Sequence, residues 1–85
     1  QSSTDLIYEL LGNSDIVKDY VKYRRLHKAN PKDSLSKKSY DRALCKVEMA
    51  VSSLHNNLKA GKKAQDVKKR KLAEKLLNHW GTYYY

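Results

Sequence analysis

The stretch from Tyr40 to Leu58, YDRALCKVEMAVSSLHNNL, has the strongest periodicity in the chain. Its large apolar residues follow one another at intervals of three and four, which places them on one face of an α-helix. These residues are Leu44, Val47, Val51, Leu54 and Leu58. The pattern predicts a helix of about four turns that buries one face in a core. Gly61 is the expected left-handed residue after its last turn.

Two shorter helices are expected before this one. The first runs from an N-cap at Ser3 or Thr4 to a stop at Gly12. The second begins after the cap residue Ser14 and ends before Pro31, because proline disfavours a helical conformation at the residue that precedes it. Its apolar stripe is expected to contain Ile16, Val17, Tyr20, Val21 and Tyr23.

A fourth helix is expected near the C-terminus, where Gly81 would terminate it. Its apolar face contains Leu72, Ala73, Leu76, Leu77 and Trp80, and we predict that Trp80 belongs to the core. Residues 31–39 form a linker, with Ser34 or Ser36 as the next cap, and residues 59–71 form a basic loop. No alternation of apolar and polar residues predicts a strand. The sequence therefore predicts an all-α fold, a small bundle of about four helices, as a single domain over residues 1–85.

The composition is strongly basic, with 18 Lys and Arg against 9 Asp and Glu and a formal charge of +9. Residues 59–71 contain seven basic side chains and one acidic residue, Asp66. We therefore expect the positive potential to be a property of the C-terminal half. Such a field attracts polyanions, which include nucleic acid, acidic protein segments and anionic membrane surfaces.

The residues that catalysis or metal binding would need are not arranged for either task. His27, His55 and His79 lie on different expected helices, and none has a second ligand one turn away. The single cysteine, Cys45, indicates a reducing compartment and is expected to be a small buried hydrophobe. No glycine pattern predicts a phosphate-binding loop. We predict a protein that is not an enzyme and that binds no metal or cofactor.

The basic run is the feature with functional content. Its candidate partner-binding residues are Lys62, Lys63, Lys68, Lys69, Arg70 and Lys71. These side chains could contact acidic protein segments, or phosphates of nucleic acid without reading sequence, or they could only solvate a loop. Insertion into a membrane surface is the weaker alternative, because the run lacks an adjacent apolar face.

The length and termini limit what can be expected of the whole protein. No segment approaches the roughly 18 apolar residues of a membrane span, so we expect a soluble protein without a membrane partner. The chain begins with Gln1 rather than methionine, which favours a fragment of a longer protein. We expect a monomer, although the spacing from Leu44 to Leu58 would also suit a dimer. The role of Tyr83 to Tyr85 stays open.

Residues 44–80 resemble a known family. Leu72-Ala73, Leu76 and Trp80 after a basic run look like the last helix of the N-terminal LW domain of transcription elongation factor S-II. In the family's preceding helix, the Ile-Gly-x-x-Val-x-x-Leu pattern corresponds here to 47–54, with valine in place of isoleucine. Glu48 replaces the glycine, His55 replaces the usual basic residue, and the connection to Trp80 is longer than usual.

The resemblance implies a fold and a function. Domains of this family are small right-handed helical bundles that do no chemistry. They bind short disordered motifs, acidic and with large apolar residues, from transcription elongation and chromatin factors in the nucleus. Under this interpretation the six basic residues contact the partner, and five apolar residues hold the bundle. The latter are Val51, Leu54, Leu72, Leu76 and Trp80.

Overall fold

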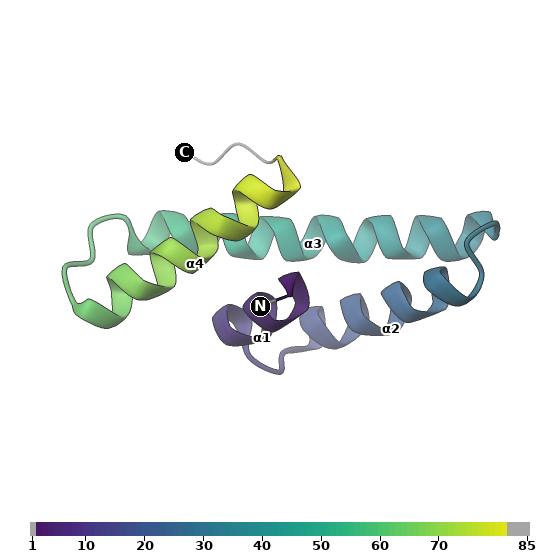
Figure 1. The fold of residues 1–85 in the computed structure, drawn as a ribbon, viewed down its shortest axis with the longest axis horizontal. Helices are drawn as coiled ribbons and strands as arrows, with labels where there is room; N and C mark the ends of the chain where they lie inside the picture. Colours follow the sequence, from purple (N-terminus) through teal and green to yellow (C-terminus); the bar gives the residue numbers. More distant parts are fainter. Residues whose placement is uncertain (1, 82–85) are drawn as a thin grey trace.

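A computed structural model of the protein describes residues 2–81 and shows four α-helices (Figure 1). They are α1 (Ser3–Leu11), α2 (Asp15–Ala29), α3 (Ser34–Leu58) and α4 (Ala64–Trp80). None of the described residues is in a strand. The predicted all-α bundle of about four helices is confirmed. The tyrosines at 83–85 lie outside the described residues.

The first helix begins one residue earlier than predicted. Ser2, and not Ser3 or Thr4, is its N-cap, and the Ser2 hydroxyl accepts a hydrogen bond of 3.2 Å from the Asp5 amide. The Asp5 carboxylate accepts in return from the Ser2 amide at 3.4 Å, which completes a capping box. Gly12 ends α1 at a positive φ of 69°, a conformation that glycine adopts without steric cost.

Local capping residues also determine where α2 and α3 begin and end. Ser14 is the N-cap of α2, as predicted, and Asn30 is its C-cap before Pro31. Asp33, rather than Ser34 or Ser36, caps α3: its carboxylate accepts from the Leu35 amide at 3.3 Å and from the Ser36 hydroxyl at 2.7 Å. The hydrogen bond from Ser36 lowers the pKa of Asp33. An ionised aspartate is a strong cap, which explains why it displaces the serines.

The connection from α3 to α4 differs from prediction at Gly61. Lys59 continues in the right-handed helical region, and only Gly12 and Gly81 have positive φ among residues 2–81. Gly61 is instead a point of close approach, because a Cβ added there would lie 2.8 Å from the Cβ of Asp66. The glycine therefore lets the start of α4 fold back against the connecting chain.

The predicted basic loop is largely helical. α4 begins at Ala64, eight residues before the apolar face at Leu72, so the charged segment is its first half. Lys, Arg, Gln and Ala all favour helix, and this propensity extends α4 toward its N-terminus although the segment has little to bury. The prediction of a loop over residues 59–71 is wrong beyond Lys63.

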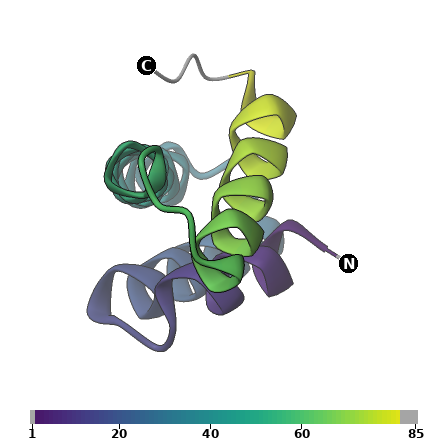
Figure 2. The ribbon, with the colours of Figure 1, turned by 90° about the vertical axis from the view of Figure 1, so that its left-hand side faces the viewer.

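The helices are arranged around one central core. α3 runs along the long axis of a molecule that measures 45 × 23 × 21 Å, with α2 beside its first half and α4 crossing its second half (Figure 1). Viewed along the length, α3, α4 and the α1–α2 pair surround the core from three sides (Figure 2). α1 contacts all three other helices. The buried apolar residues are Leu6, Ile7, Leu10, Val17, Tyr20, Ala43, Val47, Val51, Ala73, Leu76 and Leu77.

Three predicted core residues, Cys45, Ile16 and Leu58, lie outside this core, and several others, including Leu44, Leu54 and Leu72, lie half-buried at its edge. Cys45 is exposed, and Ile16 is 38% exposed. The buried face of α3 follows Ala43, Val47 and Val51, so Cys45, two residues from each of the first two, points to the opposite side of the helix. Trp80 packs against the core but stays partly exposed.

Candidate functional site

The six predicted partner-binding residues do not form one surface. Lys62 and Lys63 are exposed and precede α4, with Lys63 as its N-cap. Lys68 and Lys71 are exposed on α4, whereas Lys69 and Arg70 are half-buried. The helical repeat accounts for this division, since positions 69 and 70 are rotated by 100° and 200° from position 68.

Lys75 joins Lys68 and Lys71 on the outer face of α4. It is exposed and lies seven residues after Lys68, so the three side chains follow one another at intervals of three and four. We call these three residues the α4 lysine row. Lys75 is not among the six residues predicted from the sequence, and its spacing of four from Lys71 was the signal that could have identified it.

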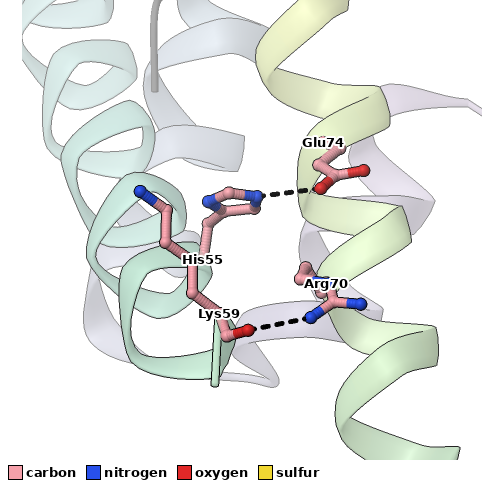
Figure 3. Close-up of polar contacts among 4 residues, drawn as sticks. All are labelled: His55, Lys59, Arg70 and Glu74. Atoms are coloured by element: carbon pink, nitrogen blue, oxygen red, sulfur yellow. Dashed lines mark hydrogen bonds and ion pairs between the residues drawn. The ribbon is translucent and has the colours of Figure 1, made fainter. Parts of the chain in front are cut away.

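Arg70 has a contact within the protein. Its Nη1 donates a hydrogen bond of 3.0 Å to the backbone carbonyl of Lys59, just after the last turn of α3 (Figure 3). Carbonyl groups at the end of a helix have no partner within it, so a cation there is favourable. Arg70 thus ties the first half of α4 to the end of α3.

A second polar contact between α3 and α4 lies one helical turn before Lys59 on α3 and one turn after Arg70 on α4. The Nε2 of His55 and the Oε1 of Glu74 are 3.1 Å apart (Figure 3). His55 is 3% exposed and is the only buried polar or charged residue of the core in the described part of the chain. Together with the Arg70 bond, this contact sets how α4 crosses α3 and therefore where the lysine row lies.

A groove runs beside the lysine row, between the start of α1 and the second half of α4. It is lined by Lys75, by the apolar residues Leu6 and Leu76, and by Ser2, Ser3 and His79. Lys75 thus stands at the rim of a groove whose two leucines belong to the core and are 3% and 0% exposed. A second groove opens where all four helices meet, and its lining contains Tyr20, Arg24, Tyr40, Leu44 and Trp80.

Aromatic rings stiffen the wall of the second groove. The Tyr40 ring stacks on His27 with centroids 5.3 Å apart and tilts against Tyr20 at 5.9 Å. Burial, followed by the charge and hydrogen bond of Tyr40, raises the pKa of Tyr20 to about 12, although Arg24 opposes the shift. Tyr20 therefore stays neutral and joins α2 to α3.

The positive charge is not confined to the C-terminal half, contrary to the sequence-based expectation. Residues 22–42 contain eight basic and two acidic residues, and so do residues 59–75. The turns within these segments lie at opposite ends of the long axis (Figure 1), and we call the segments the α2–α3 end and the α3–α4 end. Arg24 and Arg25 of the first segment also line the groove where all four helices meet. The basic residues of the α2–α3 end are Lys22, Arg24, Arg25, Lys28, Lys32, Lys37, Lys38 and Arg42.

Residues 2–81 contain neither a group of metal ligands nor a membrane-spanning helix. No three His, Cys, Asp or Glu side chains gather in a group that could hold a metal ion. In the same part of the chain, no helix is long and apolar enough to cross a membrane. Comparisons with protein-family models, with curated proteins and with solved structures found no match. The resemblance to the LW domain therefore stays a prediction from the sequence pattern.

Proposed function

We propose that this protein is an interaction domain without catalytic activity that docks short disordered segments of other proteins. The segments it would take are acidic and contain large apolar residues. The observation that supports this is the position of Lys75, which belongs to the α4 lysine row and also lines the groove over Leu6 and Leu76. One extended segment can thus meet the lysines and then a groove whose floor is formed by these two core leucines, which are 3% and 0% exposed.

The spacing of the row suits such a segment. Lys68 and Lys75 are seven residues apart on α4, which corresponds to about 10 Å along the helix axis, the length of about three extended residues. A cluster of about three acidic residues would therefore face the row, with an apolar residue following into the groove. Exposed charges would mainly speed and orient the encounter, and the apolar anchor would add affinity.

The proposal includes the setting that the sequence resemblance implies. Partners would be transcription elongation or chromatin factors, and the protein would work in the nucleus. Both statements rest on the pattern that contains Val51, Leu72 and Trp80. Electrostatic attraction of acidic segments, by contrast, needs only the charge that residues 59–75 present.

Nucleic acid is the second candidate partner. Lys68, Lys71 and Lys75 could contact successive phosphates, and binding would then weaken steeply as salt is added. The run from Lys59 to Lys71 has no aromatic residue on which a base could stack, so only backbone contacts would be available. The apolar groove beside Lys75 would have no role in such binding, and this favours the protein partner.

An NMR titration of the full chain tests whether it binds acidic protein segments or nucleic acid. The first ligand is a synthetic peptide of about 12 residues, long enough when extended to pass the row and the groove, with acidic residues around one phenylalanine. The second is the same peptide with alanine at that position, and the third is a short DNA duplex. We expect the first peptide to bind most tightly and to shift resonances of α4 and the start of α1.

Matched variants locate the contact. Replacing the three lysines of the row by glutamine should weaken peptide binding about tenfold, at about 0.5 kcal/mol for each exposed charge. The control replaces Lys18 and Lys46, which lie outside both basic ends, and should leave binding unchanged. Binding of the duplex without binding of the acidic peptide would establish the nucleic-acid alternative, and binding of neither would refute the proposal.

A further inference from the structure

The α2–α3 end combines exposed lysines with exposed leucines. Lys28, Lys32, Lys37 and Lys38 are all exposed there. Two leucines near the turn are exposed as well, Leu26 by 42% and Leu35 by 71%. Exposed leucines beside lysines suit an acidic segment with apolar residues better than they suit phosphates, which offer nothing for a leucine to contact.

The basic side chains at both ends are available for a partner. Within residues 2–81 none of these Lys and Arg side chains forms an ion pair with a carboxylate. The ion pair found in this part of the chain joins Glu74 to His55. Arg70 is engaged with a backbone carbonyl and Lys22 lies 5.5 Å from the Tyr23 ring. Arg24, Lys69 and Arg70 are half-buried, and the other basic residues of each end are exposed to solvent.

The middle of the molecule separates the two ends. Outside residues 22–42 and 59–75 the chain has only two lysines, Lys18 and Lys46, against five acidic residues. These acidic residues are Asp5, Glu9, Asp15, Asp19 and Glu48. An acidic segment would gain nothing from these carboxylates. Arg24 and Arg25 line the central groove, where all four helices meet. The exposed lysines of the α2–α3 turn, Lys28, Lys32, Lys37 and Lys38, are not among the residues that line this groove and form a surface distinct from the α4 lysine row.

We infer that the α2–α3 end is a second docking surface, and that one molecule holds two acidic stretches of a single disordered partner. This inference rests on the proposed function, because it assigns the same ligand chemistry to both ends. Once one stretch is bound, the other is held near the opposite end at a high effective concentration, and the overall affinity rises without any new type of contact.

The dimensions of the molecule set the length of chain between the two stretches. The long axis measures 45 Å. This length is an upper limit for the distance between the two surfaces, because the lysine row runs along α4 toward the middle of the molecule (Figure 1). A fully extended linker therefore needs at most roughly 13 residues, and a relaxed flexible one spans 45 Å at about 55 to 80 residues. A linker of only a few residues falls short, so affinity should depend on linker length with a threshold.

A series of peptides tests this dependence on the full chain. Each peptide has two copies of the acidic block with one phenylalanine, joined by Gly/Ser linkers of about 5, 25 or 65 residues, on either side of the threshold. The single block is the reference. We expect the shortest linker to give at most about a twofold statistical gain, and the two longer ones to bind at least about tenfold tighter than the single block.

Variants and mass measurements assign the gain to the second surface. Replacing Lys28, Lys32, Lys37 and Lys38 by glutamine should remove the gain and leave single-block binding at α4 intact. The pair Lys18→Gln and Lys46→Gln is the control and should keep the gain. Analytical ultracentrifugation with the longest peptide should give a complex of one protein and one peptide.

The possible failures are distinguishable. A flat linker series with intact single-block binding overturns the second surface and leaves the proposed function standing. Two proteins on one long peptide, or a duplex rather than the acidic block held at the α2–α3 end, overturns it as well. Absence of single-block binding refutes the proposed function itself.

Discussion

At the scale of single residues, the most consequential side chain is His55. It occupies a core position of α3 that the spacing of apolar residues did not identify, at 3% exposure. A buried imidazole needs hydrogen-bonding partners, and the Glu74 carboxylate 3.1 Å away is one of them. Because Glu74 stands on α4, the contact fixes the crossing of the two helices.

Glu74→Ala should therefore destabilise the protein. It removes the carboxylate from a buried imidazole, which costs about 1 to 2 kcal/mol and lowers Tm by several degrees in a chain of this size. Thermal unfolding followed by circular dichroism measures this. Glu48→Ala is the matched control, since burial alone raises the pKa of Glu48 and its loss should be neutral or stabilising. Equal effects of both substitutions would contradict the role given to the His55 contact.

The raised pKa of Tyr20 predicts how the stability of the protein changes at alkaline pH. Its pKa is about 12 in the folded protein, against about 10 in an unfolded chain. Between these values the unfolded state has released the proton and the folded state has kept it, so the free energy of unfolding falls as pH rises. Urea unfolding at about pH 9 and about pH 11 should show this loss. Tyr20→Phe should reduce it, whereas Tyr8→Phe, at an exposed position, should not; an unchanged loss in Tyr20→Phe would refute the assignment.

At the scale of helices, local sequence patterns predicted that each helix exists better than they predicted the residues at which it begins and ends. Gly12 and Gly81 end their helices where predicted, and Ser14 occupies the predicted N-cap position although its side chain makes no capping hydrogen bond. Asp33 was missed as a cap because three cap-type residues follow one another there, and only the hydrogen bonds distinguish them. The start of α4 was missed because the hydrophobic pattern is silent where a helix has little to bury.

The functional surface was predictable only in part. The sequence analysis identified Lys68 and Lys71, but a charge run alone does not reveal that Arg70 turns toward the Lys59 carbonyl. The groove that Lys75 shares with Leu6 depends on the crossing of α1 and α4, which are far apart in sequence. Such contacts between distant segments have no local signature.

Gly61→Ala tests the connection between α3 and α4. Its φ is unexceptional, so the expected cost comes from the added Cβ at 2.8 Å from Asp66 rather than from backbone strain. We expect destabilisation of about 1 kcal/mol or more. In a double-mutant cycle with Asp66→Gly, which removes the opposing Cβ, Gly61→Ala should cost less. Additive effects measured by urea unfolding would show that the close contact does not matter.

At the scale of the whole molecule, charge and burial have complementary distributions. The fully buried residues of α3 are Val47 and Val51, and those of α4 are Ala73, Leu76 and Leu77. Beyond the core, each end consists of two helices, which are too few to enclose an interior. Charged side chains can occupy such ends without a desolvation cost, and this explains why the basic residues accumulate there.

Hydrogen exchange should reveal this arrangement in the intact protein. Amides of α3 between Ala43 and His55 should be the most protected, and protection should fall toward both ends of the helix, because few buried contacts oppose local opening there. Each end repels itself, since eight basic residues face two acidic ones. Added salt screens charges separated by more than about 10 Å at 0.1 M, so protection should rise more at residues 59–71 and 22–42 than in the core. NMR-detected exchange at low and moderate salt makes the comparison, and uniform protection along α3, unaffected by salt, would contradict the separation of a neutral core from two charged ends.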